Sequence, residues 1–456
     1  MRTFITILLC FIVSFSVKAQ TKIFTEQELI AVVKKFHPVA RQALLNMQMA
    51  DADVTSKRGK FDPVLSTDNG SKTFDGITYY NKSDVALYIP TWYGIDIYAG
   101  QDYISGSKIN PEDTKGVLNY AGITMSVMQN LMIDKRRAAL KQAKIYREAS
   151  SVERVSILND LLQDAVKAYW DWWEKYYVSR MLQNSFDNAQ KRMMMVKTLY
   201  QFGDRPAIDT LEAFTQIQTI AIKQNEMYAE LRKSQLELST FLWKEKDSQF
   251  DLPEDAIPQE INANETISID QLLKAATMHP DLLQYDFKLN ALTIEKKLKF
   301  QSLLPDVKLK YNRIGPDFSS TVNGALFQNN FRYGISFSMP LLLSEGRGEY
   351  RKAGLKIENT RLEQVNKSIL VNTKVKQSYT DWIQLTSQLG LQEKLVANII
   401  ALQRGEETRF ANGESSLFLI NSREMKTIET QQKLIELQAK KSKSLVKLKW
   451  AAGLFN

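Results

Sequence analysis

The chain has 456 residues, 44% of them hydrophobic and 24% charged, which is enough apolar material to bury one large core or several and excludes a chain that is disordered throughout. Its formal net charge of +9 is spread along the sequence rather than gathered into basic runs, which argues against nucleic acid as a partner. The single cysteine, Cys10, excludes a disulfide within one chain.

The N-terminal residues have the pattern of a secretory signal peptide. Arg2 precedes an apolar run over residues 4–17, and a small-residue site ending at Ala19 predicts cleavage before Gln20. Because Cys10 lies inside this signal, the mature chain is expected to have no thiol nucleophile and no N-terminal lipid anchor. No later run reaches the roughly 18 apolar residues that a membrane helix needs, so the exported chain is expected to stay soluble or to cross a membrane as a β-barrel.

Two matching His-Pro pairs indicate that one structural unit is written twice. His37 and His279 are the only histidines, and each stands directly before a proline. Pro63 and Pro305 are separated by as many residues as His37 and His279 are. The sequence AYWDW of the first half also has a counterpart, SYTDW, in the second. Proline removes a helix donor and disfavours helical backbone at the residue before it, so each pair is predicted to mark a joint between helices rather than an active site.

These repeats define the predicted domains. We expect a signal peptide over residues 1–19 and two repeats of helix, strands and a long helical hairpin, over residues 20–252 and 253–456. The first repeat carries a β insertion at about 74–117 that the second lacks. A turn is expected beside Pro90, but the sequence leaves open whether the insertion lengthens the first β-hairpin or adds another.

Strand segments with alternating polarity lie between the helices. From residue 331 to 339 the odd positions are apolar and the even positions are polar or small, and residues 121–127 and 307–311 alternate in the same way. Such strands fit a barrel with a lipid-facing exterior and a polar lumen, and they fit one layer of a soluble sandwich equally well. On the barrel hypothesis, the lumen face carries Thr124, Ser126, Arg332, Ser336 and Ser338. The strands are too few to close a wide barrel alone, so several chains would have to contribute.

Two long helical hairpins complete the repeats. Residues 133–202 contain neither glycine nor proline and are rich in good helix formers. Roughly seventy helical residues would extend about 105 Å, which favours a coiled coil or a barrel of helices. The predicted return helix covers residues 207–252, and the second hairpin covers 347–409 and 416–452.

Start and stop signals mark the hairpin tips. Pro206 suits a first helical turn, and Ser415 or Ser416 suits an N-cap. Gly203 and Gly413 can take a positive φ without steric cost, so they are predicted to shape the two turns.

Several motifs recur in one order along the chain: the His-Pro joint, the strand start FDP, the helix opening IDKRRAALKQAK, and the tips YQFGDRPAIDTLEA and FANGESSLFLINSRE. Together with the tandem repeat, they resemble the TolC-like outer-membrane efflux protein family over nearly all of the chain beyond the signal. The resemblance implies a mostly α-helical α+β fold that assembles as a homotrimer in outer-membrane lipid. It further implies a β-barrel in the outer membrane of a Gram-negative bacterium, continued by a long α-helical barrel in the periplasm.

The resemblance also assigns roles to the tips. Residues at and beside the tip glycines are expected to dock a periplasmic adaptor (membrane fusion) protein, and they are Tyr200, Gly203, Asp204, Arg205, Pro206, Phe410, Gly413, Glu414 and Ser415. Residues further along the return helices are expected to form the periplasmic gate, and they are Asp209, Glu212, Leu419, Ser422 and Arg423. The second tip lacks the acidic pair of the first, which argues against an acidic constriction there.

The protein is predicted to be a passive exit duct of a tripartite efflux system, whose other two components are the adaptor and an inner-membrane pump. The duct is expected to carry small molecules, such as drugs, toxic compounds or metals, to the exterior. No catalytic residue, metal site or cofactor is predicted, because neither histidine breaks the repeat symmetry. The outer-membrane component of type I protein secretion has the same architecture and stays open as an alternative. A soluble periplasmic coiled-coil scaffold is an alternative of a different class, and a hydrolase is the weakest candidate.

Overall fold

The computed structural model describes residues 23–245, 248–253, 255–261, 267–323, 326–327 and 329–455, so the predicted signal peptide lies outside the described residues. The chain folds into two compact units, here called unit 1 and unit 2. Unit 1 draws on Met1–Gln42, Ile157–Ala276 and Val371–Asn456, and unit 2 on Ala43–Ser156 and Thr277–Leu370. Each unit takes segments from both halves of the sequence, so the repeat boundaries do not coincide with unit boundaries and stay a prediction.

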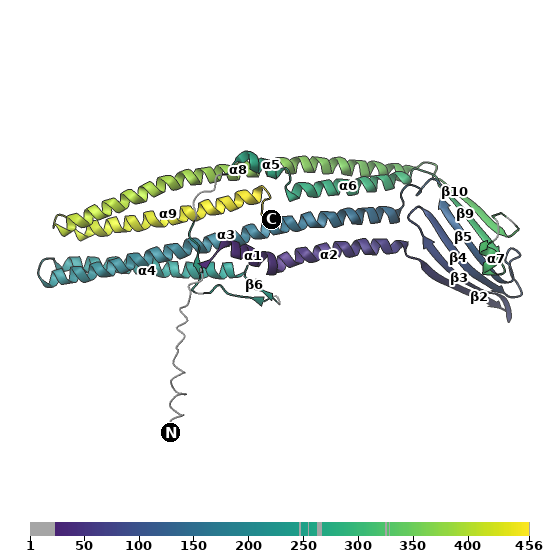
Figure 1. Cartoon of the computed structure of the whole chain (residues 1–456), viewed down its shortest axis with the longest axis horizontal. Helices are drawn as coiled ribbons and strands as arrows, with labels where there is room; N and C mark the ends of the chain where they lie inside the picture. Colours follow the sequence, from purple (N-terminus) through teal and green to yellow (C-terminus); the bar gives the residue numbers. More distant parts are fainter. Residues whose placement is uncertain are drawn as a thin grey trace, which may run out of the picture. The chain divides into compact units, whose positions relative to one another are not determined.

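Unit 1 consists mainly of helices. The longest are α3 (Lys135–Gln201) and α8 (Ser344–Ala411), both of which begin in unit 2, and the return helices are α4 (Ala207–Ser239) and α9 (Leu417–Ala451). As Figure 1 shows, α3 with α4 and α8 with α9 form two helical hairpins. Two shorter helices, α1 (Glu26–Phe36) and α5 (Ile269–Ala276), also belong to this unit.

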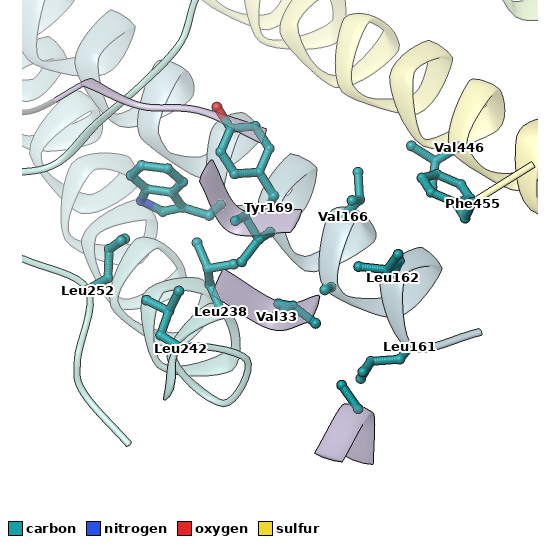
Figure 2. Packing of buried hydrophobic residues seen from close by; sticks show 14 of the residues in the cluster. Val33, Leu161, Leu162, Val166, Tyr169, Leu238, Leu242, Leu252, Val446 and Phe455 are labelled. Atoms are coloured by element: carbon teal, nitrogen blue, oxygen red, sulfur yellow. The ribbon is translucent and has the colours of Figure 1, made fainter. Parts of the chain in front are cut away.

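The core of unit 1 lies where α1, α3 and α4 meet. Val33 of α1, Leu162 and Tyr169 of α3, and Leu238 of α4 belong to one buried cluster (Figure 2). The hydroxyl of Tyr169 donates to the carbonyl oxygen of Phe24 at 2.9 Å, so this buried polar group is satisfied. A parallel pairing of β1 (Ile23–Phe24) with β8 (Ile257–Pro258) holds the extended N-terminal segment beside this core.

The first return helix is shorter than predicted, because α4 ends at Ser239 and not near residue 252. The following residues form a small hairpin of β6 (Trp243–Lys244) and β7 (Ser248–Gln249). Phe241 stacks on the His37 ring at 5.9 Å between centroids, and Leu242 is fully buried in the core. Burial of Leu242 and packing of the partly buried Phe241 therefore outweigh the helix propensity of the segment.

The two histidines act at helix ends, as the sequence predicted. α1 ends at Phe36, and α2 (Pro38–Arg58) begins directly after His37, whose Nδ1 accepts from the backbone N–H of Val39 at 3.2 Å. His279 is the N-cap of α6 (Pro280–Gln301), and its Nδ1 accepts from the N–H of Asp281 at 3.2 Å.

We expect His279→Ala to lower the stability of the protein by about 0.5–2 kcal/mol, because the substitution removes the acceptor for an orphan helix N–H. His279→Asn is the matched control, since its side-chain oxygen can accept the same bond. The thermal unfolding midpoint of the purified protein measures both. An Asn variant that melts as early as the Ala variant would show that capping is not the contribution of this side chain.

Unit 2 contains α2, α6, the first parts of α3 and α8, and a six-stranded antiparallel sheet. The strands are β2 (Val64–Phe74), β3 (Ile77–Pro90), β4 (Ile95–Ser105), β5 (Gly116–Ser126), β9 (Asp306–Gly315) and β10 (Phe331–Ser338). Their order is β10-β9-β5-β4-β3-β2, and the short helix α7 (Phe318–Asn323) lies between β9 and β10 in sequence. The insertion thus forms β3 and β4 and gives the first half of the chain two β-hairpins.

The two faces of the sheet differ in polarity. The pairing register shows which residues of neighbouring strands share a face. Ile335 pairs with Leu309, which in turn pairs with Met125, so this cross-strand row is apolar. The adjacent row joins Ser336, Lys308 and Ser126 and is polar. The register likewise places Thr124, Arg332 and Ser338 on the polar face, because each lies an even number of positions from a member of this row. Among the described helices, none combines the length and apolar character that crossing a membrane requires.

Candidate functional site: the paired hairpin tips

The first tip, between α3 and α4, is closed by a glycine in the left-handed region. Gly203 has φ +79°, and its N–H donates to the carbonyl of Tyr200 at 3.0 Å. The next N–H, that of Asp204, donates to Leu199 at 3.0 Å. These two bonds form a Schellman motif, which satisfies the last carbonyls of α3 and reverses the chain.

The second tip, between α8 and α9, repeats the same turn. Gly413 has φ +80° and donates to Phe410 at 3.0 Å, and the N–H of Glu414 donates to Arg409 at 2.8 Å. The turn is therefore one local motif used twice, and glycine is needed at the same position of each copy because other L-residues rarely adopt this conformation.

The return helices begin differently at the two tips. Pro206, predicted in the first turn of α4, is instead its N-cap, with φ −74° and ψ 156°, so its extended backbone lies just outside the helix. At the second tip Ser416 is the N-cap, and its hydroxyl accepts from the N–H of Leu419 at 3.4 Å. The neighbouring Ser415 donates its hydroxyl to Glu406 at 2.6 Å, so this side chain bonds back to α8.

Arg205 connects the two tips. Its guanidinium lies over the ring of Phe410, 4.1 Å from the centroid, and Nη2 donates to the carbonyl oxygen of Phe410 at 3.3 Å. Asp209, one helical turn further on, holds the same guanidinium at 3.8 Å. The expected gate residue Asp209 thus pairs within its own tip, and the contact to the other tip is made by Arg205.

The remaining expected gate residues do not form one cluster with Asp209. Glu212 does lie close enough to interact electrostatically with Asp209. Burial and the nearby Asp209 carboxylate raise the pKa of the Glu212 side chain above its ordinary value. Leu419 and Ser422 are exposed on α9. Arg423 lies 3.8 Å from Glu406 of α8, so it pairs across its own hairpin.

Glu406 is a site residue that the sequence analysis missed. It is only 7% exposed, and it receives the Ser415 hydroxyl and lies 3.8 Å from both Arg409 and Arg423. This buried carboxylate thus connects the start of α9 with the last turns of α8 at the second tip.

A second missed group ties the two hairpins together behind the tips. Arg192 of α3 makes a two-pronged ion pair with Glu424 of α9 at 2.8 and 2.9 Å, and Gln216 of α4 donates to the same carboxylate at 2.9 Å. Glu424 is 4% exposed. One pattern in the sequence could have predicted the burial of Glu424. Leu417, Ile420 and Ile428 repeat at helical spacing, and Glu424 falls on the same face of α9.

Between the tips lies a cavity of about 740 Å³ with both apolar and charged walls. The side chains that line it come from both hairpins, and they include Lys191, Arg192, Met195, Leu199, Arg205, Glu407, Phe410 and Ile420. The lining also contains Asp204, so apolar side chains, basic groups and acidic groups all face this cavity. Such a mixed lining suits an amphipathic helical segment of a partner.

Comparison with known proteins identifies the fold. No protein-family model matches the sequence, and a search of curated proteins found no match. Among solved structures, the Campylobacter jejuni CmeC outer membrane channel is similar with a TM-score of 0.65 and 14% identity, over 94% of this chain and 85% of that one. The open-state Neisseria gonorrhoeae MtrE outer membrane channel matches with a TM-score of 0.66 and 13% identity, over 94% and 88% of the two chains. The outer membrane protein VceC of Vibrio cholerae matches with a TM-score of 0.64 and 12% identity, over 94% and 96%.

The chain therefore has the fold of these outer-membrane channels over nearly its whole length, and the mostly helical α+β fold predicted from its resemblance to TolC-like proteins is confirmed. At this level of identity the likeness concerns the fold. The roles of individual tip residues stay predictions.

Proposed function

We propose that this protein is the passive exit duct of a tripartite efflux system in the outer membrane of a Gram-negative bacterium. Three copies would join their sheets into one barrel in the lipid and their hairpins into one helical barrel in the periplasm. The single observation that carries the proposal is the fold match to outer-membrane channels over 94% of the chain. The energy for transport would come from the inner-membrane pump, so the duct needs no chemistry of its own.

The difference in polarity between the two faces of the sheet supports its location in the lipid bilayer. Tyr333, Ile335 and Phe337 project from one face of β10 and are each at least 66% exposed in the single chain. In a lipid bilayer this exposure is favourable, whereas in water it would leave a large apolar patch uncovered.

The tips support a role in docking an adaptor. They carry a preformed groove, and their turns are held by two Schellman motifs and by the contact of Arg205 with Phe410. A surface already fixed in one conformation loses little entropy when a partner binds. We assign adaptor docking to the residues around Gly203 and Gly413, and resting closure to the same end of the hairpins.

Deleting the gene from its host tests the function. The intracellular level of a fluorescent efflux substrate, such as an ethidium dye, should rise in the deletion strain and fall again when the gene is restored. Unchanged dye levels together with the loss of a secreted protein would favour type I secretion. Recovery of the protein in the soluble periplasmic fraction would instead favour the coiled-coil scaffold.

We expect Ile335→Arg to impair assembly in the membrane, at a cost of about 2–4 kcal/mol if the residue lies near the bilayer midplane. Ser336→Arg is the matched control, because the next residue of β10 points to the polar face. The amount of folded oligomer in the outer-membrane fraction measures both variants. Equal losses for the two substitutions would contradict a lipid-facing apolar side.

A further inference from the structure

The six-stranded sheet of unit 2 has two open edges. Within the described part of the chain, β2 pairs only with β3, and β10 pairs only with β9. These edges are 11 and 8 residues long, so each presents a row of backbone N–H and C=O groups without a ladder partner. In hydrocarbon such groups are too costly to leave unpaired, and a closed barrel is the arrangement that pairs them.

The number of strands decides how copies can join. Every neighbouring pair in the sheet is antiparallel, and the number of strands is even, so β2 and β10 run in opposite directions. The β10 edge of one copy can therefore meet the β2 edge of the next as an antiparallel pair. Repeating this contact around an axis gives a ring, since the interface joins two different edges rather than one edge to itself.

The inserted strands belong to the same layer as the others. One cross-strand row consists of Tyr333, Tyr311, Ile123, Ile97 and Ile89, so it is apolar from β10 across to β3. A neighbouring row reaches the edge strand itself, through Ala121, Ala99, Leu87 and Leu65. The apolar face thus continues over β4, β3 and the start of β2.

The polar face of the insertion is also tied to the rest of unit 2. Tyr120 of β5 donates its hydroxyl to Asp84 of β3 at 2.8 Å. Arg136 of α3 bonds Asp96 of β4 at 3.0 Å. Charged groups of the inserted hairpin therefore point to the same side as the polar residues of β5 and β9, which is the side away from lipid in a barrel.

We propose that β10 of each copy pairs with β2 of the next, so that three copies close an 18-stranded barrel to which β3 and β4 contribute six strands. This inference rests on the proposed trimer. With a strand spacing of about 4.8 Å and a tilt of about 40°, 18 strands give a backbone diameter of about 36 Å. A barrel of 12 strands, with the β2–β3 hairpin outside it, would measure about 24 Å. The larger barrel leaves a wide aqueous exit for bulky cargo.

Disulfide trapping between copies tests the proposal, and the predicted mature chain contains no cysteine of its own. Leu65→Cys on β2 is combined in turn with Tyr333→Cys, Ile335→Cys or Phe337→Cys on β10. The matched series replaces Leu65→Cys by Ala99→Cys, which lies in the same cross-strand row but on β4. Paired strands bring Cα atoms within the distance that a disulfide requires.

After treatment of intact cells with a membrane-permeant oxidant, at least one Leu65→Cys combination should give covalent dimers and trimers on a non-reducing denaturing gel. The Ala99→Cys series and each single-cysteine variant should stay monomeric. Trapping through Ala99→Cys would overturn the proposal, because β4 would then form the edge between copies. A lack of trapping in both series, with the variants still trimeric and still exporting dye, would also overturn it while leaving the proposed function intact. Variants found only as soluble monomers would contradict the proposed function itself.

Discussion

Gly203→Val and Gly413→Val should each abolish export while trimers remain in the outer membrane. Both glycines have φ near +80° and close a Schellman motif, and a β-branched residue in this conformation costs about 1–2 kcal/mol. An added Cβ meets no atom within 4 Å at either position, so the strain comes from the backbone turn itself. Relieving it requires a different turn, which changes the surface offered to the adaptor and leaves the sheet untouched.

The control for this prediction is Gly405→Val. Gly405 lies inside α8 close to the second tip, its added Cβ also meets nothing within 4 Å, and it does not have a positive φ. Export of a dye, cross-linking to the adaptor and the amount of outer-membrane trimer are measured for all three variants. Normal export by both tip variants would mean that the turns do not form the docking surface.

Glu424→Leu and Arg192→Met should each destabilise the paired hairpins by about 3–5 kcal/mol, because each leaves one charge buried without its partner. The carboxylate is 4% exposed and bonds both guanidinium nitrogens at 2.8 and 2.9 Å. The double variant Arg192→Met with Glu424→Leu should regain most of the loss, since apolar side chains of similar volume can fill the same space.

Thermal unfolding followed by circular dichroism measures these variants, and limited proteolysis reports on the tips. The single variants should melt earlier and be cut faster near residues 192–216 than the double variant. If the double variant melts as early as the single ones, the loss comes from packing rather than from an unpaired charge.

Features that depend on residues close together in sequence could be predicted from the sequence. The positive φ of Gly203 and Gly413 follows from glycine at the end of a long helix, and the joints at His37 and His279 follow from the proline after each. The two-sided character of the strands follows from alternation of polarity along the chain.

Features that depend on partners far apart in sequence were not predictable in this way. Arg205 and Phe410 come from different halves of the chain, and only the packing of two hairpins brings them together. The insertion was recognised as β structure, but its place as two interior strands of the sheet depends on pairing with β2 and β5. Burial of Leu242 ended α4 earlier than helix propensity indicated.

Images of single particles, extracted from the outer membrane in detergent, test the account most directly. We predict particles with three-fold symmetry in which a barrel continues into a tube of helices around one continuous lumen. Particles of one or two copies, or three-fold particles without a lumen, would contradict the assignment of this protein as an exit duct.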